Sequence, residues 1–111
     1  MDRRLHNRSL ADLDVRVTRI KKPEQRIHGT FRDLSDAGIC LLLPCELREG
    51  EMVKLEAADS TVFGYVVYSA WKRNAFRTGI EVEKVLLGGS DLAKLLRSVL
   101  EDTMPAVLQS R

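Results

Sequence analysis

The sequence predicts a small, mainly β domain with one helix near its C-terminus. Three observations lead to this fold class: six short segments have the pattern of strands, turn residues separate them, and one amphipathic stripe of helical spacing follows. The 111 residues suit a single domain, and a hydrophobic fraction of 44% allows a core without a metal or a disulfide. Six short antiparallel strands favour a barrel or a sandwich, and closure into a barrel would leave no exposed strand edge.

The first three expected strands lie in the N-terminal half of the chain. Residues 15–19 alternate apolar and polar side chains, which is the period of a half-buried strand. Residues 21–25 are polar and contain a proline, so we expect a loop there. An extended pattern resumes over 28–34, a turn follows at 35–38, and 39–43 form a short apolar strand.

Three more strands are expected after a connection over residues 44–51. Alternation predicts strands at 53–57, at 61–70 and at 76–82. Within the second of these, Gly64 indicates a bulge or a bend, because glycine weakens a regular strand. The polar residues between the last two strands are suited to the tip of a hairpin.

The C-terminal helix is expected to begin at Ser90, a suitable N-cap. Apolar residues at positions 92, 95, 96, 99 and 100 make one helical stripe, and Pro105 marks its expected end. We expect the stripe to pack on a mouth or flank of the barrel, with a dimer contact as the alternative. The chain thus divides into an arm at 1–13, a barrel at 14–87, and a helix and tail at 88–111.

No motif in the sequence indicates catalysis, metal binding or membrane insertion. Cys40 and Cys45 lack the spacing of a zinc motif, and neither His6 nor His28 belongs to a catalytic constellation. The longest apolar run, at 39–43, is far shorter than the roughly 18 residues of a membrane span, and no signal-peptide pattern is present. We therefore expect a cytoplasmic binding module that is not an enzyme, with no metal or resident cofactor and with both cysteines reduced in or beside the core.

The charge is concentrated at the N-terminal end, although the net charge is only +2. Residues 1–32 hold nine basic and four acidic residues, a net charge of +5, so the remaining 79 residues carry −3. Basic segments attract phosphates, whether these belong to nucleic acid, lipid or a small nucleotide. The front of the chain is therefore a candidate anion-binding segment, with a solvated arm as the plainer interpretation.

Three short motifs, in this order, resemble those of the PilZ domain family. Residues 4–8 read RLHNR, an RxxxR, and residues 33–38 read DLSDAG, a DxSxxG, with 24 residues between them. The third, GIEV at residues 79–82, falls in the last expected strand. The resemblance extends from about Arg3 to the C-terminal helix. It departs from the commoner pattern at Ala37, where many members have glycine, and at Val82, where an aromatic residue is frequent.

This resemblance implies a six-stranded antiparallel β-barrel closed by a C-terminal α-helix, and a receptor for the bacterial second messenger cyclic di-GMP. It implies a set of ligand-contacting residues, with Arg3 as a peripheral candidate: Arg4, Arg8, Asp33, Ser35 and Gly38. Domains of this type change conformation or partner surface when they bind the messenger, and they regulate motility, biofilm or exopolysaccharide output. The expected partners are therefore cyclic di-GMP and a protein effector, for a chain that is a monomer or a weak dimer.

These residue types suit the chemistry of such a ligand. A guanidinium pairs with guanine O6 and N7 or with a phosphate, as we expect of Arg4 and Arg8. The Asp33 carboxylate can accept from guanine N1 and N2, which distinguishes guanine from adenine. Ser35 can donate to a phosphate or brace the turn, and Gly38 lets the ligand approach the backbone. We expect the arm to be mobile without ligand and to fold over the barrel when the messenger binds.

Other interpretations of the same residues remain open. Asp33 and Ser35 can simply form a turn, and Gly38 can be a turn glycine. Trp71 is either a base-stacking residue or a rim residue, and we leave it out of the expected site. A single-stranded nucleic-acid-binding barrel is the first rival function, but only 5% of the residues are aromatic and none interleaves the basic arm, so nucleic acid is not expected. The second rival is a PilZ-like protein-interaction scaffold that does not bind the messenger.

Overall fold

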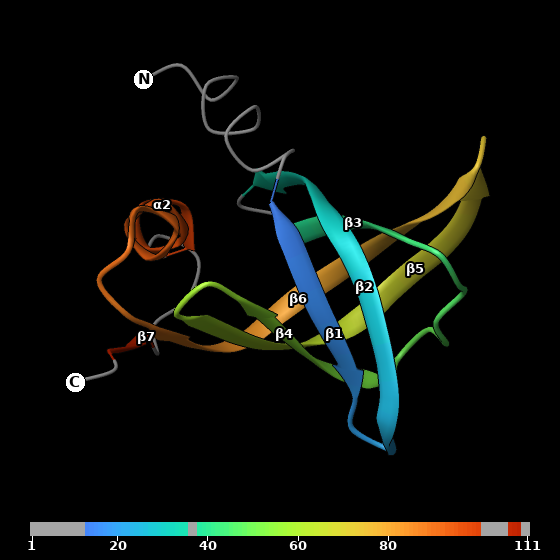
Figure 1. The fold of residues 1–111 in the computed structure, drawn as a ribbon, viewed down its shortest axis with the longest axis horizontal. Helices are drawn as coiled ribbons and strands as arrows, with labels where there is room; N and C mark the ends of the chain where they lie inside the picture. The colour runs from blue at the N-terminus through green and yellow to red at the C-terminus, as the bar shows by residue number, and fades with distance from the viewer. Residues whose placement is uncertain (1–12, 36–37, 101–106, 110–111) are drawn as a thin grey trace.

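Six antiparallel strands close into a barrel in the computed structural model, which describes residues 13–35, 38–100 and 107–109 (Figure 1). In chain order the described elements are β1 (Asp14–Arg19), β2 (Lys22–Ser35), β3 (Gly38–Leu43), β4 (Met52–Ala57), β5 (Ser60–Lys72), β6 (Ala75–Leu87), α2 (Asp91–Leu100) and β7 (Val107–Gln109). The strands are adjacent in the order β3-β2-β1-β4-β5-β6, and an additional pairing of β3 with β6 closes the ring. The predicted fold class is therefore confirmed.

One further strand lies outside the barrel. β7 pairs in parallel with the end of β6, through Val85, Leu86 and Leu87 of the longer strand. It covers only three residues, and so short a segment carries no recognisable alternation in the sequence. The prediction of six strands missed it for this reason.

Two of the expected strand limits were wrong. Residues 22–25 were expected in a loop, but β2 begins at Lys22, opposite Arg19, and the regular register resumes where Thr18 faces Arg26. Pro23 lies in the stretch between these two pairs, so its missing N–H breaks no ladder bond. The last barrel strand was expected to end at residue 82, but β6 continues to Leu87.

A bulge explains the error at the end of β6. Gly64 of β5 faces Val82, whereas its neighbour Phe63 faces Lys84, so one residue of β6 is left without a partner. Beyond the extra residue, the inward-facing positions of β6 are shifted by one. The buried Val85 and Leu87 therefore do not continue the alternation seen before it, and simple alternation does not predict them. The expected irregularity at Gly64 is confirmed.

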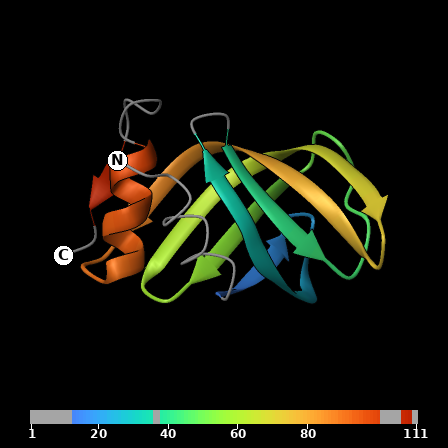
Figure 2. The same ribbon diagram turned by 90° about the horizontal axis from the view of Figure 1, so that it is seen from above.

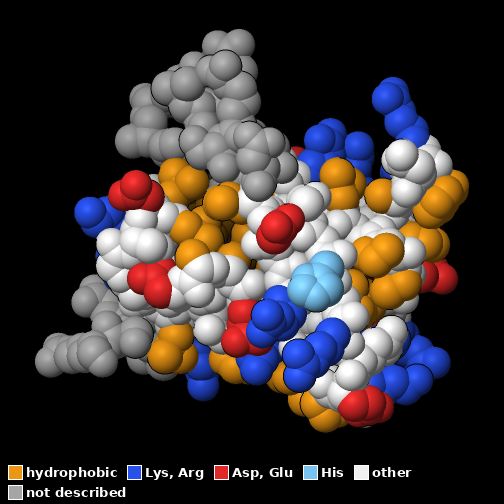
Figure 3. Space-filling view, viewed as in Figure 1, with side chains coloured by type: hydrophobic (Ala, Val, Ile, Leu, Met, Phe, Trp, Pro, Cys, Tyr) orange, Lys and Arg blue, Asp and Glu red, His pale blue; other side chains and the backbone are white. Residues whose placement is uncertain are grey.

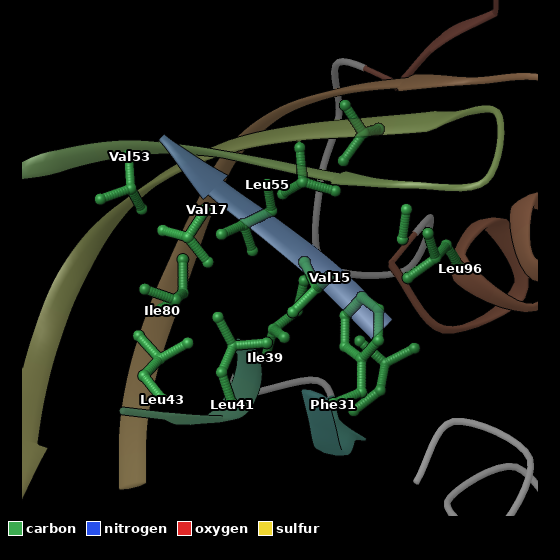
Figure 4. Packing of buried hydrophobic residues seen from close by; sticks show 14 of the residues in the cluster. Val15, Val17, Phe31, Ile39, Leu41, Leu43, Val53, Leu55, Ile80 and Leu96 are labelled. Atoms are coloured by element: carbon green, nitrogen blue, oxygen red, sulfur yellow. The ribbon is translucent and has the colours of Figure 1, made fainter. Parts of the chain in front are cut away.

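The core fills the barrel with inward-facing residues from all six barrel strands, which alternate with outward-facing ones except at the bulges. Figure 4 shows Val15 and Val17 of β1, Leu55 of β4 and Ile80 of β6 converging on the same interior. Val17 and Leu41 are among the side chains with no exposed surface. Cys40 is buried and Cys45 is half-buried against the core, both as free thiols, as predicted.

The helix α2 covers one end of the barrel, opposite the tip of the β5–β6 hairpin (Figures 1 and 2). Leu92, Ala93 and Leu96 are buried in the same cluster as the barrel core, which confirms that the apolar stripe packs on the barrel. Ser90 caps the helix as predicted, since its Oγ accepts from the Ala93 N–H at 3.1 Å. Asp59, in the β4–β5 turn, accepts from the N–H groups of Gly89 and Ser90 and from the Ser90 hydroxyl. No described helix is long and apolar enough to cross a membrane.

Candidate ligand-binding site

Four neighbouring strands each place one outward-facing residue in a single row across the barrel wall. Asp33 of β2 faces Cys40 of β3, Cys40 faces Gly79 of β6, and Gly79 faces Tyr68 of β5. Adjacent strands are about 4.8 Å apart, so the row is about 14 Å long. We call these four residues the cross-strand row, and they form the floor of the candidate site.

A hollow of about 250 Å³ lies along the cross-strand row. Pockets for ligands of drug size span about 300–1,000 Å³, so this hollow is suited to only part of a larger ligand, such as one base. The following residues line it: Asp33, Gly38, Ile39, Cys40, Val67, Tyr68, Gly79 and Ile80.

Two glycines allow the wall of the hollow to form. Gly38 has a φ of +133°, a conformation that side chains disfavour, and a Cβ there would strike the carbonyl oxygen of Ile80. A Cβ on Gly79 would strike the ring of Tyr68. The Tyr68 ring therefore lies directly over the backbone of Gly79, in space that only glycine leaves open.

Tyr68 is held in place by a contact with a thiol. Its hydroxyl lies 3.5 Å from the Cys40 Sγ, and either group can donate. This hydrogen bond, together with burial, raises the pKa of Tyr68 to about 12, so the phenol stays protonated at neutral pH. Burial raises the pKa of the Cys40 thiol as well, which removes the thiolate that a reactive cysteine needs. The pair therefore forms part of the wall of the hollow.

A bulge in β5 turns Tyr68 toward the hollow. Val66 faces Ile80, and the next paired residue on β5 is Tyr68, so Val67 is the extra residue. Without this insertion Tyr68 would share the inner face of Val66. Tyr68 was not among the expected site residues, although a glycine in the middle of a strand, at position 79, is a signal that another group approaches the backbone closely.

Beyond the same bulge, Trp71 lies on the face of β5 opposite to that of Tyr68. Trp71 follows Ser69 by two residues on β5, and the Ser69 hydroxyl lies 3.3 Å from that of the buried Thr78. Trp71 packs edge-on against Phe76, with ring centroids 5.1 Å apart, and is not among the residues that line the hollow. In the structure Trp71 therefore lies outside the hollow.

The structure brings together two of the residues expected from the DxSxxG motif. Asp33 and Gly38 both line the hollow. Ser35 pairs with Gly38 where β2 meets β3, but its side chain lies outside the described part of the chain. Arg3, Arg4 and Arg8 also lie outside the described residues.

The described chain begins beside this motif. The Leu13 carbonyl accepts from the Phe31 N–H at 3.2 Å, two residues before Asp33 on β2. The preceding arm therefore joins the barrel next to the cross-strand row. Among the described residues, no three His, Cys, Asp or Glu side chains gather as a metal site would require.

The fold is a small β-barrel with a hollow on its outer wall. A family model of the PilZ domain matches residues 2–87, which span the arm and all six barrel strands. The chain belongs to the PilZ domain family, and this membership suggests a receptor for cyclic di-GMP. No curated protein and no solved structure compared with the chain gave a match.

Proposed function

We propose that this protein binds cyclic di-GMP in the hollow along the cross-strand row, with Arg4 and Arg8 completing the site from the arm. One arrangement carries the proposal: Asp33 and Gly38 line the same hollow, and Leu13, the residue before β1, is bonded to β2 beside it. Membership of the PilZ family, whose domains are typically binding modules without catalytic activity, supports the same conclusion.

The length of the arm is sufficient for both arginines to reach the hollow. Arg8 lies five residues before Leu13 and Arg4 nine residues before it. At about 3.4 Å per extended residue, these segments span up to about 17 Å and 30 Å. Phe31, which holds Leu13, lies about 7 Å along β2 from Asp33. The arm therefore needs no rearrangement of the barrel to bring either guanidinium to the ligand.

The hollow supplies complementary groups for a guanine. The Asp33 carboxylate accepts hydrogen bonds, which suits the N1 and N2 donors of guanine and not the edge of adenine. The Tyr68 ring, 42% exposed, offers a face on which a base can stack. Because the hollow is suited to about one base, the second guanine and the phosphates remain for the arginines of the arm.

Isothermal titration calorimetry with cyclic di-GMP tests this proposal directly. The wild-type protein should bind, and Arg4→Ala or Arg8→Ala should abolish binding while the thermal melt of the free protein changes little. Arg26→Ala is a matched control, since Arg26 is an exposed arginine on β2 that faces Thr18, away from the hollow. Cyclic di-AMP, which lacks the guanine donors, should bind far more weakly than cyclic di-GMP.

Two rival functions are distinguished by the same titrations. A single-stranded nucleic-acid binder would prefer an oligonucleotide and would lose affinity steeply with salt. On the face seen in Figure 3, acidic side chains lie among the basic ones, so this face is not the continuous basic surface that such a binder needs. A messenger-blind scaffold would bind neither ligand. We also propose, by analogy with the family, that the ligand-bound protein acts on a protein effector and regulates motility, biofilm or exopolysaccharide output.

A further inference from the structure

An arginine that the DxSxxG and RxxxR motifs do not include lies beside the hollow. Arg77 precedes Gly79 by two residues on β6, so both residues face the outside of the barrel. It faces Leu42 of β3 and Ala70 of β5, and these three residues form the row next to the cross-strand row. Same-face neighbours on a strand are about 7 Å apart, which the long side chain of an arginine can bridge.

Arg77 flanks the hollow on the side opposite to the motif turn. Along β3, Gly38 lies two residues before Cys40, whereas Leu42, the partner of Arg77, lies two residues after it. The turn and Arg77 therefore border the cross-strand row on its two long sides. A ligand seated on the row would lie between them.

The guanidinium of Arg77 has no partner among the described residues. Within the part of the chain that the structure describes, its buried Nε has no hydrogen-bond acceptor and no ion pair holds the group. Burial raises the pKa of Cys40, and the hydrogen bond with Cys40 raises that of Tyr68; the positive charge of Arg77 opposes both rises, which shows that it lies near these two groups. The negative charge of Asp33 contributes to raising the pKa of Cys40 and of Tyr68. A guanidinium that no described acceptor or carboxylate holds can turn its terminal N–H donors toward an anionic ligand on the row.

We propose that Arg77 is a third arginine of the ligand site, which binds a phosphate of the dinucleotide on the side of the hollow opposite to Gly38. This inference rests on the proposed function. The phosphates are the charged acceptors of the ligand, and a guanidinium forms its strongest hydrogen bonds with such groups. Asp33 and Tyr68 then bind the base, while Arg77 fixes the position of the backbone of the ligand relative to them.

Calorimetry on three variants tests this role. Arg77→Met retains the apolar stem and removes the donors, and we expect it to weaken cyclic di-GMP binding about tenfold to hundredfold. Arg77→Lys retains the charge without the planar fork, so its affinity should lie between those of Arg77→Met and the wild type. The control is Arg26→Met, about 20 Å farther along β2 from the hollow, which should bind like the wild type.

Thermal melts of the free proteins separate a ligand contact from a structural role. If Arg77 only supports the fold, Arg77→Met should lower the melting temperature, and Arg77→Lys should bind no better than Arg77→Met once both are folded. Wild-type affinity in Arg77→Met would overturn this inference and leave the proposed function standing. Absence of binding by the wild type would instead overturn both.

Discussion

Replacing Gly79 by alanine tests the wall of the hollow, because the new methyl group would occupy the space under the Tyr68 ring. A Cβ at this position would lie 2.8 Å from ring carbons Cδ2 and Cζ and closer still to Cε2. Carbon atoms in contact are about 3.5–4.0 Å apart, so the ring has to retreat by about 1 Å or more. That movement breaks the 3.5 Å contact between the Tyr68 hydroxyl and Cys40.

The cost to the free protein should be modest. Gly79 does not have a positive φ, so alanine brings no backbone strain there. Overpacking costs about 1–3 kcal/mol, and we expect the lower end, because a ring that is 42% exposed can move toward solvent. Each 1 kcal/mol lowers the melting temperature of a domain of this size by roughly 4–8 °C.

The cost to ligand binding should be larger. Stacking of a base on an aromatic ring contributes about 1–3 kcal/mol, so a displaced Tyr68 should weaken cyclic di-GMP binding about fivefold to 150-fold. Thermal melts and calorimetry on Gly79→Ala, Tyr68→Ala and the double variant form a double-mutant cycle. In the Tyr68→Ala background the methyl group meets no ring, so Gly79→Ala should have little further effect. An equal effect in both backgrounds would refute this account of the wall.

The remaining predictions concern two clusters outside the hollow. Burial works to raise the pKa of the Glu51 carboxyl, but its bonds with Arg19, at 2.8 and 2.9 Å, and with the Arg48 N–H outweigh burial and lower this pKa below its ordinary 4.5. Because the folded pKa is lowered, the stabilisation is present above about pH 4.5 and is lost as the pH falls through the folded value. Denaturant unfolding between pH 3 and 6 should therefore show the stability gap between wild type and Glu51→Gln closing at low pH, and a constant gap would contradict this. Ser90→Ala removes the acceptor for the Ala93 N–H and should destabilise α2 by about 1 kcal/mol, seen as faster amide exchange over 91–100. Ser90→Thr is its control, and loss of protection as large as that in Ser90→Ala would argue against the cap.

Much of the barrel could be predicted from local pattern because each strand buries one face. Val15 and Val17, or Val53 and Leu55, alternate with polar residues and are buried as that alternation requires. The predictions were wrong where the pattern was interrupted. A bulge displaces the alternation near the end of β6, and at the start of β2 a proline lies opposite an irregular stretch.

The candidate site was predictable only in part, because its residues come from four strands. Asp33 and Gly38 belong to one short motif and were therefore visible together in the sequence. Cys40, Tyr68 and Gly79 join them through the pairings of β3 with β6 and of β5 with β6. The roles of Arg4, Arg8 and Ser35 stay predictions, since those side chains lie outside the described residues.

The sequence by itself determined where most strands lie along the chain, the cap and apolar face of the helix, and the motif residues, because each depends on neighbours a few positions away. Only the tertiary structure decided which residues face the hollow. Val67 adds one residue to β5, so Tyr68 turns outward and Trp71 turns away, against the alternation that the sequence displays. The pairing of β5 with β6 brings Gly79 under the Tyr68 ring. Closure of β3 on β6 then brings Cys40 and Gly38 to the same hollow, and a pairing between strands so far apart in the chain leaves no local trace.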